Sequence, residues 1–231
     1  MRIPSFRSSP RRTPHGARHR PKGREQSFTV ATINDDFGTP RRSNFSWVNA
    51  DVMLGQETKF TPLRRLKDET AFGVHQNFKN RAKAGSSIVW KKGDRIKAKD
   101  RGYVLGVRSR GAKMLSRYIN WTDLKVDGRD IRMVSVHRPP WRFRRLWPQF
   151  DRALAHFVKS RKAPIIVGLD ANQHHPRRLA RVTGLRWHAV GGSIDGFLAS
   201  RDVKFDTIRK LKKGSSNHHP VLARVHLARQ A

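Results

Sequence analysis

The chain has 231 residues, of which 36% are hydrophobic, and it has no cysteine, which excludes disulfides, thiolate zinc sites and cysteine nucleophiles. Its 50 lysines and arginines against 17 aspartates and glutamates give a formal net charge of +33, which repels itself in a compact fold unless a polyanion is present. Nucleic acid is therefore the predicted partner, and a basic structural protein of a ribosome or virion is the alternative.

Residues 1–26 differ in composition from the rest, with eight basic residues, four prolines and one acid, Glu25. We expect a disordered arm that raises affinity for nucleic acid without sequence choice, or else a solvated tail with no specific role. No signal peptide or transmembrane segment is predicted, so we expect no membrane partner and an intracellular location, cytoplasmic or associated with nucleic acid. Residues 27–231 are predicted to form one domain.

From Ser27 onward, short β-type runs alternate with Gly, Pro and Asp. The predicted strands are Phe28–Ile33, Val52–Gly55, Ser86–Trp90, Tyr118–Trp121, Ile131–Val136, Ile165–Leu169, Ile194–Ala199 and Val221–Val225. A short helix is predicted over Pro62–Glu69, and a longer one begins near Trp147 or Pro148 with apolar residues at helical spacing. This pattern predicts two packed sheets with helices outside.

Polar residues follow several of these strands, where the ends of neighbouring strands can bring them to one edge of a sheet. They are Asn34, Glu57, His137, Asp170 with Asn172, Asp195, and His218 beside His219. Carboxylate and amide oxygens can hold a hard divalent cation, a second carboxylate can deprotonate water, and histidines can stabilise charge on a phosphate. These residue types therefore indicate phosphodiester hydrolysis.

Taken singly, each position has a simpler interpretation. Glu57 is also compatible with a solvated turn, Asp170 with Asn172 forms a possible Asx turn, and His137 precedes two prolines in a possible surface loop. Asp195 is harder to dismiss, because a carboxylate inside an apolar strand needs a partner, and a histidine is a good one. The order of the whole set carries the prediction.

That order resembles the endonuclease/exonuclease/phosphatase superfamily, which includes DNase I and exonuclease III. The motifs are Thr32-Ile33-Asn34, Gln56-Glu57, Ser135-Val136-His137, Gly168-Leu169-Asp170-Ala171-Asn172, Ser193-Ile194-Asp195 and Ser216-Asn217-His218-His219-Pro220. They span about Ser27 to Leu227. The resemblance implies a four-layer α/β-sandwich of two mainly antiparallel sheets with helices outside.

The resemblance also implies a role for each matching residue. Glu57 would be the chief ligand of Mg²⁺ or Mn²⁺, with Asn34 beside it, and Asp170 would orient or deprotonate the attacking water. Asn172 would position the water and the phosphate. His218, oriented by Asp195, would contact the phosphate, and His137 would assist at the phosphate or at the leaving oxygen.

One position departs from the family, which normally has Ser-Asp-His where this chain has Ser216-Asn217-His218. An amide oxygen of Asn217 can still coordinate a cation, but it lacks the charge that favours Mg²⁺. We therefore expect Asn217 to be a metal ligand and the metal to bind more weakly, without loss of activity.

The charge selects the substrate within this superfamily, which also contains lipid phosphodiesterases. A net charge of +26 remains after the +7 of the arm is removed, far more than a small phosphorylated substrate requires. Basic residues interleaved with aromatic ones follow His137 and can neutralise phosphates and stack on bases. The predicted nucleic-acid-binding residues are Lys59, Arg138, Trp141, Arg142, Arg144 and Arg145.

No base-reading motif is found, so a non-specific or structure-directed DNA endonuclease is the predicted function. DNA over RNA follows from the resemblance alone. An abasic-site repair nuclease and a non-catalytic nucleic-acid-binding protein on the same fold are the alternatives, with a lipid phosphodiesterase third. The sequence makes no prediction about the oligomeric state.

Overall fold

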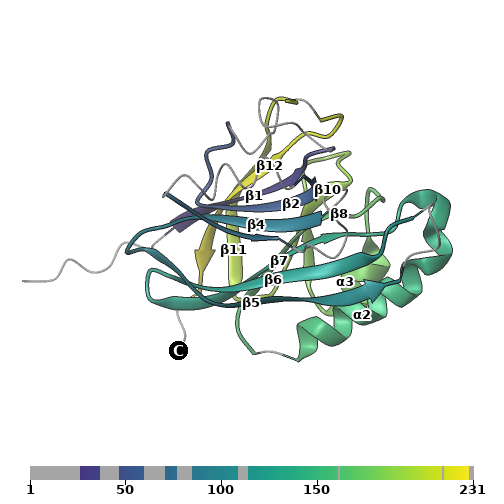
Figure 1. Cartoon of the computed structure of the whole chain (residues 1–231), viewed down its shortest axis with the longest axis horizontal. Coiled ribbons are helices and arrows are strands. Elements are labelled where there is room, and N and C mark those ends of the chain that lie inside the picture. Colours follow the sequence, from purple (N-terminus) through teal and green to yellow (C-terminus); the bar gives the residue numbers. More distant parts are fainter. Residues whose placement is uncertain are drawn as a thin grey trace, which may run out of the picture.

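Two six-stranded sheets packed face to face form the body of the protein in the computed structural model (Figure 1). The structure describes residues 27–36, 47–59, 71–76, 85–108, 114–160, 162–214 and 216–228. The first sheet has the order β11 (Val203–Lys210), β12 (Val221–Leu227), β1 (Ser27–Asn34), β2 (Val52–Thr58), β4 (Gly85–Lys91), β3 (Phe72–Gln76). The second has the order β5 (Ile96–Val107), β6 (Arg117–Val126), β7 (Arg129–His137), β8 (Ile165–Asp170), β10 (Asp195–Ala199), β9 (Arg186–His188).

Apolar side chains from both sheets fill the space between them. Leu54 and Ile88 of the first sheet belong to one buried cluster with Met133, Ile166 and Phe197 of the second. Strands β7 and β8 are parallel neighbours at the centre of the second sheet, and all six residues of β8 are buried. A central parallel strand is covered on both faces, which explains why β8 has an unbroken apolar run rather than an alternating one.

Helix α2 (Trp147–Lys159) covers the outer face of the second sheet (Figure 1). Its apolar residues Phe150 and Leu154 are fully buried in a cluster that also contains Val167 of β8. Helix α3 (Arg177–Thr183) packs beside α2 and ends at Gly184, whose φ of +73° suits a left-handed helix end. None of the helices that the structure describes is both long and apolar enough to cross a lipid bilayer.

The architecture confirms the predicted α/β sandwich of two facing sheets with helices outside. All eight predicted strands are present; seven extend further than predicted, β10 begins one residue later than predicted, and the long helix begins at Trp147 as expected. The predicted helix Pro62–Glu69 and the arm lie outside the described residues. Strands β3, β5, β9 and β11 were not predicted; in β5 and β11 exposed residues predominate, so an apolar pattern is missing.

Both sheets bring strand ends to one edge of the sandwich, which we call the site rim. Strands β1, β2, β7, β8 and β11 end there, whereas β6, β10 and β12 begin there, as follows from their parallel and antiparallel pairing. We call the other edge the opposite rim.

The two sheets approach each other closely just below the site rim. A Cβ atom on Gly168 of β8 would lie 2.7 Å from Cβ of Leu54 in β2, so only glycine fits here. Beside it, the buried amide of Gln56 donates to the carbonyl of Gly168 at 3.3 Å and to Oγ of Ser135 at 3.1 Å. These bonds join β2 to the second sheet, so the spacing of the sheets is set within two residues of both Glu57 and Asp170.

Candidate active site at the strand ends

Asp170 is the residue around which the site rim is organised. It ends β8, is 2% exposed, and lies opposite His137 on one side and Asp195 on the other in the strand register. The side-chain amide of Asn34 donates to its Oδ2 at 2.9 Å, and the backbone N–H of Asn172 donates to its Oδ1 at 2.8 Å. Both carboxylate oxygens are therefore held in a fixed orientation.

Burial of Asp170, together with the neighbouring charge of Asp195, raises the pKa of its carboxyl to about 7. Desolvation penalises the charged form of a carboxyl group, and a second carboxylate adds repulsion. A carboxylate with this pKa can accept a proton from water near neutral pH. The role of Asp170 as a base that orients or deprotonates water stays a prediction, and it requires a carboxylate of this kind.

His218 and Asp195 form a hydrogen-bonded pair next to Asp170. Nδ1 of His218 is 2.8 Å from Oδ2 of Asp195, and its Nε2 lies 4.0 Å from Oδ2 of Asp170. Burial opposes protonation of His218, but the hydrogen bond and charge of Asp195 and the charge of Asp170 raise its pKa to about 9. The ring is therefore a cation at neutral pH and turns Nε2–H towards the site.

Asn172 and Glu57 both have unusual backbone conformations. Each has a φ of +50°, a left-handed conformation that non-glycine residues rarely adopt. The pairing of β2 with β4 shifts register between Gly55 and Thr58, which redirects the side chain of Glu57. The side-chain amide of Asn172 donates to the carbonyl of Arg138 at 2.9 Å. Strained backbone often marks functional positions, and both residues were predicted from the sequence.

Arg117, which the sequence analysis missed, begins β6 and is buried at the site rim. Its Nη1 lies 3.1 Å from Nδ1 of His137. A guanidinium can only donate, so Nδ1 of His137 must accept, and the ring proton is on Nε2, which lies 3.4 Å from Oδ2 of Asp170. Burial, reinforced by the charge of Arg117, holds the pKa of His137 well below its ordinary value. His137 is therefore a neutral donor facing Asp170.

The residues at the rim fit a hard divalent cation. Glu57 and Asn34 lie at the ends of adjacent strands, and Oε1 of Glu57 is 3.4 Å from Nδ1 of His137. Burial raises the pKa of Glu57 although Arg117 opposes this, so a cation beside this carboxylate would offset the cost of its charge. Carboxylate and amide oxygens are the donors that Mg²⁺ and Mn²⁺ prefer.

A second group of potential ligand atoms, from Asp170, Asp195 and His218, lies within 4.8 Å of one another. His218 is poorly suited to bind a metal, because its Nδ1 is bonded to Asp195 and a protonated ring has no free lone pair. Oδ1 of Asp195 is buried and has no hydrogen-bond partner among the residues that the structure describes. Glu57 and Asn34 therefore remain the better candidates, and Asn217, exposed next to His218, remains a prediction.

The predicted nucleic-acid-binding residues have different environments. Trp141 lies in the 3₁₀ helix η4 (Trp141–Leu146) and is 58% exposed. Arg142, Arg144 and Arg145 of the same helix are also exposed, whereas Lys59, which follows β2, is half-buried. Arg138 is different. It is 1% exposed, forms two hydrogen bonds with Asp151 at 2.7 and 3.0 Å, and stacks over Trp147. Its guanidinium therefore stabilises the protein and cannot reach a phosphate, contrary to expectation.

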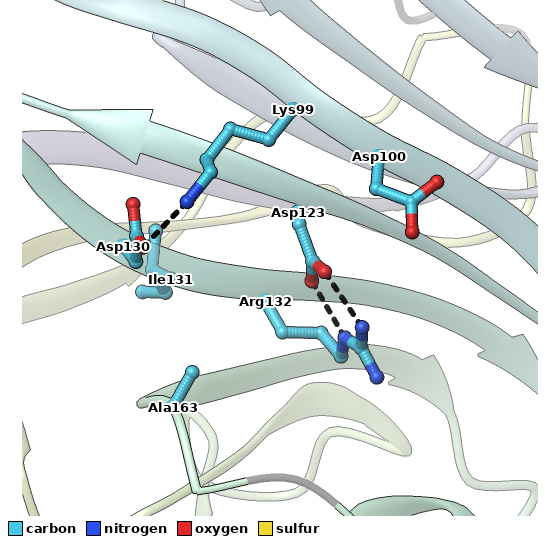
Figure 2. Close-up of a pocket in the computed structure, with 7 residues that line it drawn as sticks. All are labelled: Lys99, Asp100, Asp123, Asp130, Ile131, Arg132 and Ala163. Carbon is cyan, nitrogen blue, oxygen red and sulfur yellow. Dashed lines mark hydrogen bonds and ion pairs between the residues drawn. The ribbon is translucent and has the colours of Figure 1, made fainter.

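A pocket with a volume of about 340 Å³ lies away from this site (Figure 2). Asp130 and Arg132 line it, seven and five residues before His137 along β7, which is about 17–23 Å at roughly 3.3 Å per residue. Arg132 pairs with Asp123 and Lys99 with Asp130, as Figure 2 shows. Both cations that line this pocket are paired with aspartates, and Asp100 is a further acid at its wall, so the pocket lacks the histidines and the carboxylate of raised pKa that mark the site rim.

Solved structures share this fold. An endonuclease/exonuclease/phosphatase family protein from Bacteroides thetaiotaomicron matches with a TM-score of 0.67 and 14% identity, over 89% of this chain and 99% of that one. The B. thetaiotaomicron mannosyl-6-phosphatase Bt3783 matches with 0.65 and 14%, over 86% and 99%. The human Nocturnin catalytic domain with bound sulfate matches with 0.65 and 15%, over 87% and 94%.

The sequence itself matches no protein-family profile and no curated protein. Structural likeness at such low identity shows the fold alone. This fold is the one that the ordered motifs predicted, that of the endonuclease/exonuclease/phosphatase superfamily.

Proposed function

We propose that this chain is a divalent-metal-dependent phosphodiesterase that hydrolyses nucleic acid, as a non-specific or structure-directed DNA endonuclease. One observation carries the proposal: buried Asp170 is oriented by Asn34 and Asn172 and faces the protonated ring of His218, which Asp195 holds. This combination offers a proton acceptor and a positive hydrogen-bond donor on either side of one position. The charge of +33 supports a polyanionic substrate.

Asp170 acts in this proposal as the general base. Its carboxylate, with a pKa of about 7, accepts a proton from the attacking water. The hydrogen bonds from Asn34 and Asn172 fix its direction, so that the water is held in line with the phosphorus. Asn172 orients the water and the phosphate with the same side chain that it anchors on the carbonyl of Arg138.

His218 and His137 stabilise the charge that develops on the phosphate. His218 donates from Nε2 as a cation, and Asp195 is a positioning residue that holds its ring through Nδ1. His137 donates from Nε2 as a neutral ring, which suits a hydrogen bond to a phosphate or leaving oxygen. Because Arg117 occupies its Nδ1, His137 cannot take up a proton without breaking that contact.

Glu57 and Asn34, with Asn217 as a third ligand, would hold Mg²⁺ or Mn²⁺. When bound, the cation neutralises negative charge on the phosphate and lowers the pKa of water. Weak affinity is expected, because Asn217 supplies an amide where the family has a carboxylate.

Exposed cations beside the site hold the polynucleotide in this proposal. Arg142, Arg144 and Arg145 are exposed and are proposed to contact phosphates, and the exposed ring of Trp141 is proposed to contact a base. Lys59 follows Glu57 by two residues and is proposed to contact the same polynucleotide strand. The arm, residues 1–26, adds eight basic residues. Such contacts give affinity without sequence choice, in keeping with a non-specific nuclease.

The direct test is nicking of supercoiled plasmid with Mg²⁺ or Mn²⁺, followed by addition of EDTA. Cleavage that requires the metal supports the proposal, and an abasic-site duplex assayed in parallel reveals a repair specificity. Binding without cleavage at any metal concentration would instead identify a non-catalytic nucleic-acid-binding protein.

Asp170→Ala provides the matched variant. Removing the general base is expected to lower kcat by about 10²–10⁴-fold. Binding of the same DNA in EDTA should remain within a few-fold of that of the unaltered protein, because Asp170 carries no positive charge. Equal loss of binding and cleavage would contradict the assigned role.

A further inference from the structure

Four exposed cations lie at the end of β11, directly before the loop that carries His218. They are Arg209, Lys210, Lys212 and Lys213, which we call the β11 basic segment. No acidic residue follows Asp206 in the sequence. Within the described ranges, none of the four makes an ion pair, and Lys210 donates only to the carbonyl of Gly191 at 3.2 Å. Their charge is therefore open to an external partner.

The β11 basic segment is hydrogen-bonded to the loop that carries His218. The N–H of Leu211 donates to the carbonyl of Pro220 at 2.8 Å, and Nδ1 of His219 lies 2.8 Å from the carbonyl of Leu211. Leu211 is thus bonded to the two residues that follow His218. The cations on either side of Leu211 are held next to the site by these two hydrogen bonds.

The opposite rim carries charges of both signs, and several of them are paired. Arg95 bonds Asp127, Lys99 bonds Asp130, and Arg132 bonds Asp123, the last two in the pocket of Figure 2. The excess positive charge is therefore not spread evenly. The β11 basic segment contains no acid, whereas the exposed lysines of the opposite rim, among them Lys92, Lys97 and Lys125, lie among aspartates, which favours a polyanionic partner beside the site.

The site lies between two exposed basic elements of different sheets. Helix η4 begins four residues after His137, which ends β7 of the second sheet. The β11 basic segment ends five residues before His218, which lies in the loop between β11 and β12 of the first sheet. We propose that the β11 basic segment is a second phosphate-binding element, which holds the polynucleotide backbone on the side of the scissile phosphate opposite η4. Phosphates recur every ~3.4 Å of axis along each strand, so neighbours of the scissile phosphate come within reach.

Holding the backbone on both sides favours cleavage inside a chain over removal of a terminal phosphate. This inference rests on the proposed function, since it takes the scissile phosphate to lie between Asp170 and His218. It adds a substrate requirement: the enzyme prefers polynucleotides that extend past the site in both directions.

The test compares two variants of the full chain with the same loss of charge. One carries Arg209→Gln, Lys210→Gln, Lys212→Gln and Lys213→Gln. The control carries Lys92→Gln, Lys97→Gln, Lys125→Gln and Lys204→Gln, exposed lysines of the strands and their ends at the opposite rim. Affinity for a labelled duplex of about 30 base pairs is measured in EDTA at several salt concentrations.

The β11 variant should bind at least about tenfold more weakly near 150 mM salt, and its log–log salt slope should fall by about 0.9 per lost phosphate contact. The control should change little. A third variant with Lys210→Arg, Lys212→Arg and Lys213→Arg keeps the charge and should keep the slope. Thermal melting establishes that all variants are folded.

Equal losses in the β11 variant and the control, or no loss in either, would overturn the inference. If the unaltered protein neither binds nor cleaves polynucleotides, the proposed function fails instead. The two failures are therefore distinguishable in one set of measurements.

Discussion

Arg117 donates to Nδ1 of His137 from a distance of 3.1 Å, and this contact decides which ring nitrogen of the histidine carries the proton. We assign Arg117 an effect through His137 alone, which makes it a positioning residue. Its removal would let the ring of His137 adopt the other tautomer and bond the carboxylate of Glu57, 3.4 Å from the same nitrogen.

Arg117→Met is therefore expected to lower kcat by about 10–100-fold with a smaller change in KM, because a donor in the transition state is misdirected. Arg117→Lys keeps a donor and should recover part of the loss. Nitrogen NMR of the histidine rings, assigned with His137→Gln, reports the tautomer directly. If the ring of His137 keeps its proton on Nε2 in Arg117→Met, the assignment of this role is wrong.

The pH dependence of kcat/KM should be bell-shaped. Asp170 must be deprotonated to act as a base, and its pKa is raised to about 7, so activity falls as the pH drops below about 7. His218 must be protonated, and its pKa is raised to about 9, so activity falls as the pH rises above about 9. The two limbs describe the interacting site as a whole.

Rates measured from about pH 5 to pH 10 check this expectation, and His218→Asn should remove the alkaline limb. A bound cation near Asp170 would lower the pKa of its carboxyl, so the acidic limb of the profile should move to lower pH as the metal concentration rises. An acidic limb that stays in place at saturating metal would show that the cation does not lie near Asp170.

Asn217→Asp should strengthen metal binding. A carboxylate in place of the amide adds a full negative charge beside the proposed cation, and a gain of about 1.4 kcal/mol corresponds to a tenfold lower Mg²⁺ concentration for half-maximal activity. Asn49→Asp is the matched control, since Asn49 is exposed at the opposite rim. If both variants respond alike, or neither responds, Asn217 is not a ligand.

Arg138→Met should lower the free energy of unfolding by about 3–5 kcal/mol, because it leaves the buried carboxylate of Asp151 without its main partner. Adding Asp151→Leu should restore much of the loss, since an apolar pair can replace a buried ion pair. Urea denaturation measures both effects. A stable Arg138→Met protein with weakened DNA binding would instead favour the role predicted from the sequence.

The sequence predicted the fold and most of the site because the site residues stand at the ends of apolar runs. Asn34, His137 and Asp170 end strands whose pattern is plain, and Asp195 lies in an apolar stretch. Arg117 was missed although it directly precedes the predicted strand Tyr118–Trp121. An arginine before a strand is common, and only the antiparallel pairing of β6 with β7 shows that this end reaches the site.

Arg138 shows why the basic stretch after His137 was misinterpreted at one position. Its sequence context is the same as that of Arg142, Arg144 and Arg145, yet its partner Asp151 lies thirteen residues away on α2. A pairing of this kind depends on how the helix packs against the sheet, which composition does not reveal. Similarly, β5 has exposed residues along most of its length, so no apolar alternation marks it as a strand.

The contact between Gly168 and Leu54 places a limit on how this protein can change. Any side chain at Gly168 would push β8 away from β2. The hydrogen bond from Asn34 to the carboxylate of Asp170, two residues after Gly168, would then be lost. Substitutions at this contact between the sheets should therefore lower kcat before they lower the free energy of unfolding. Sequence variation is better tolerated in the surface segments flanking the site rim, where the chain can differ without altering the distance between the sheets.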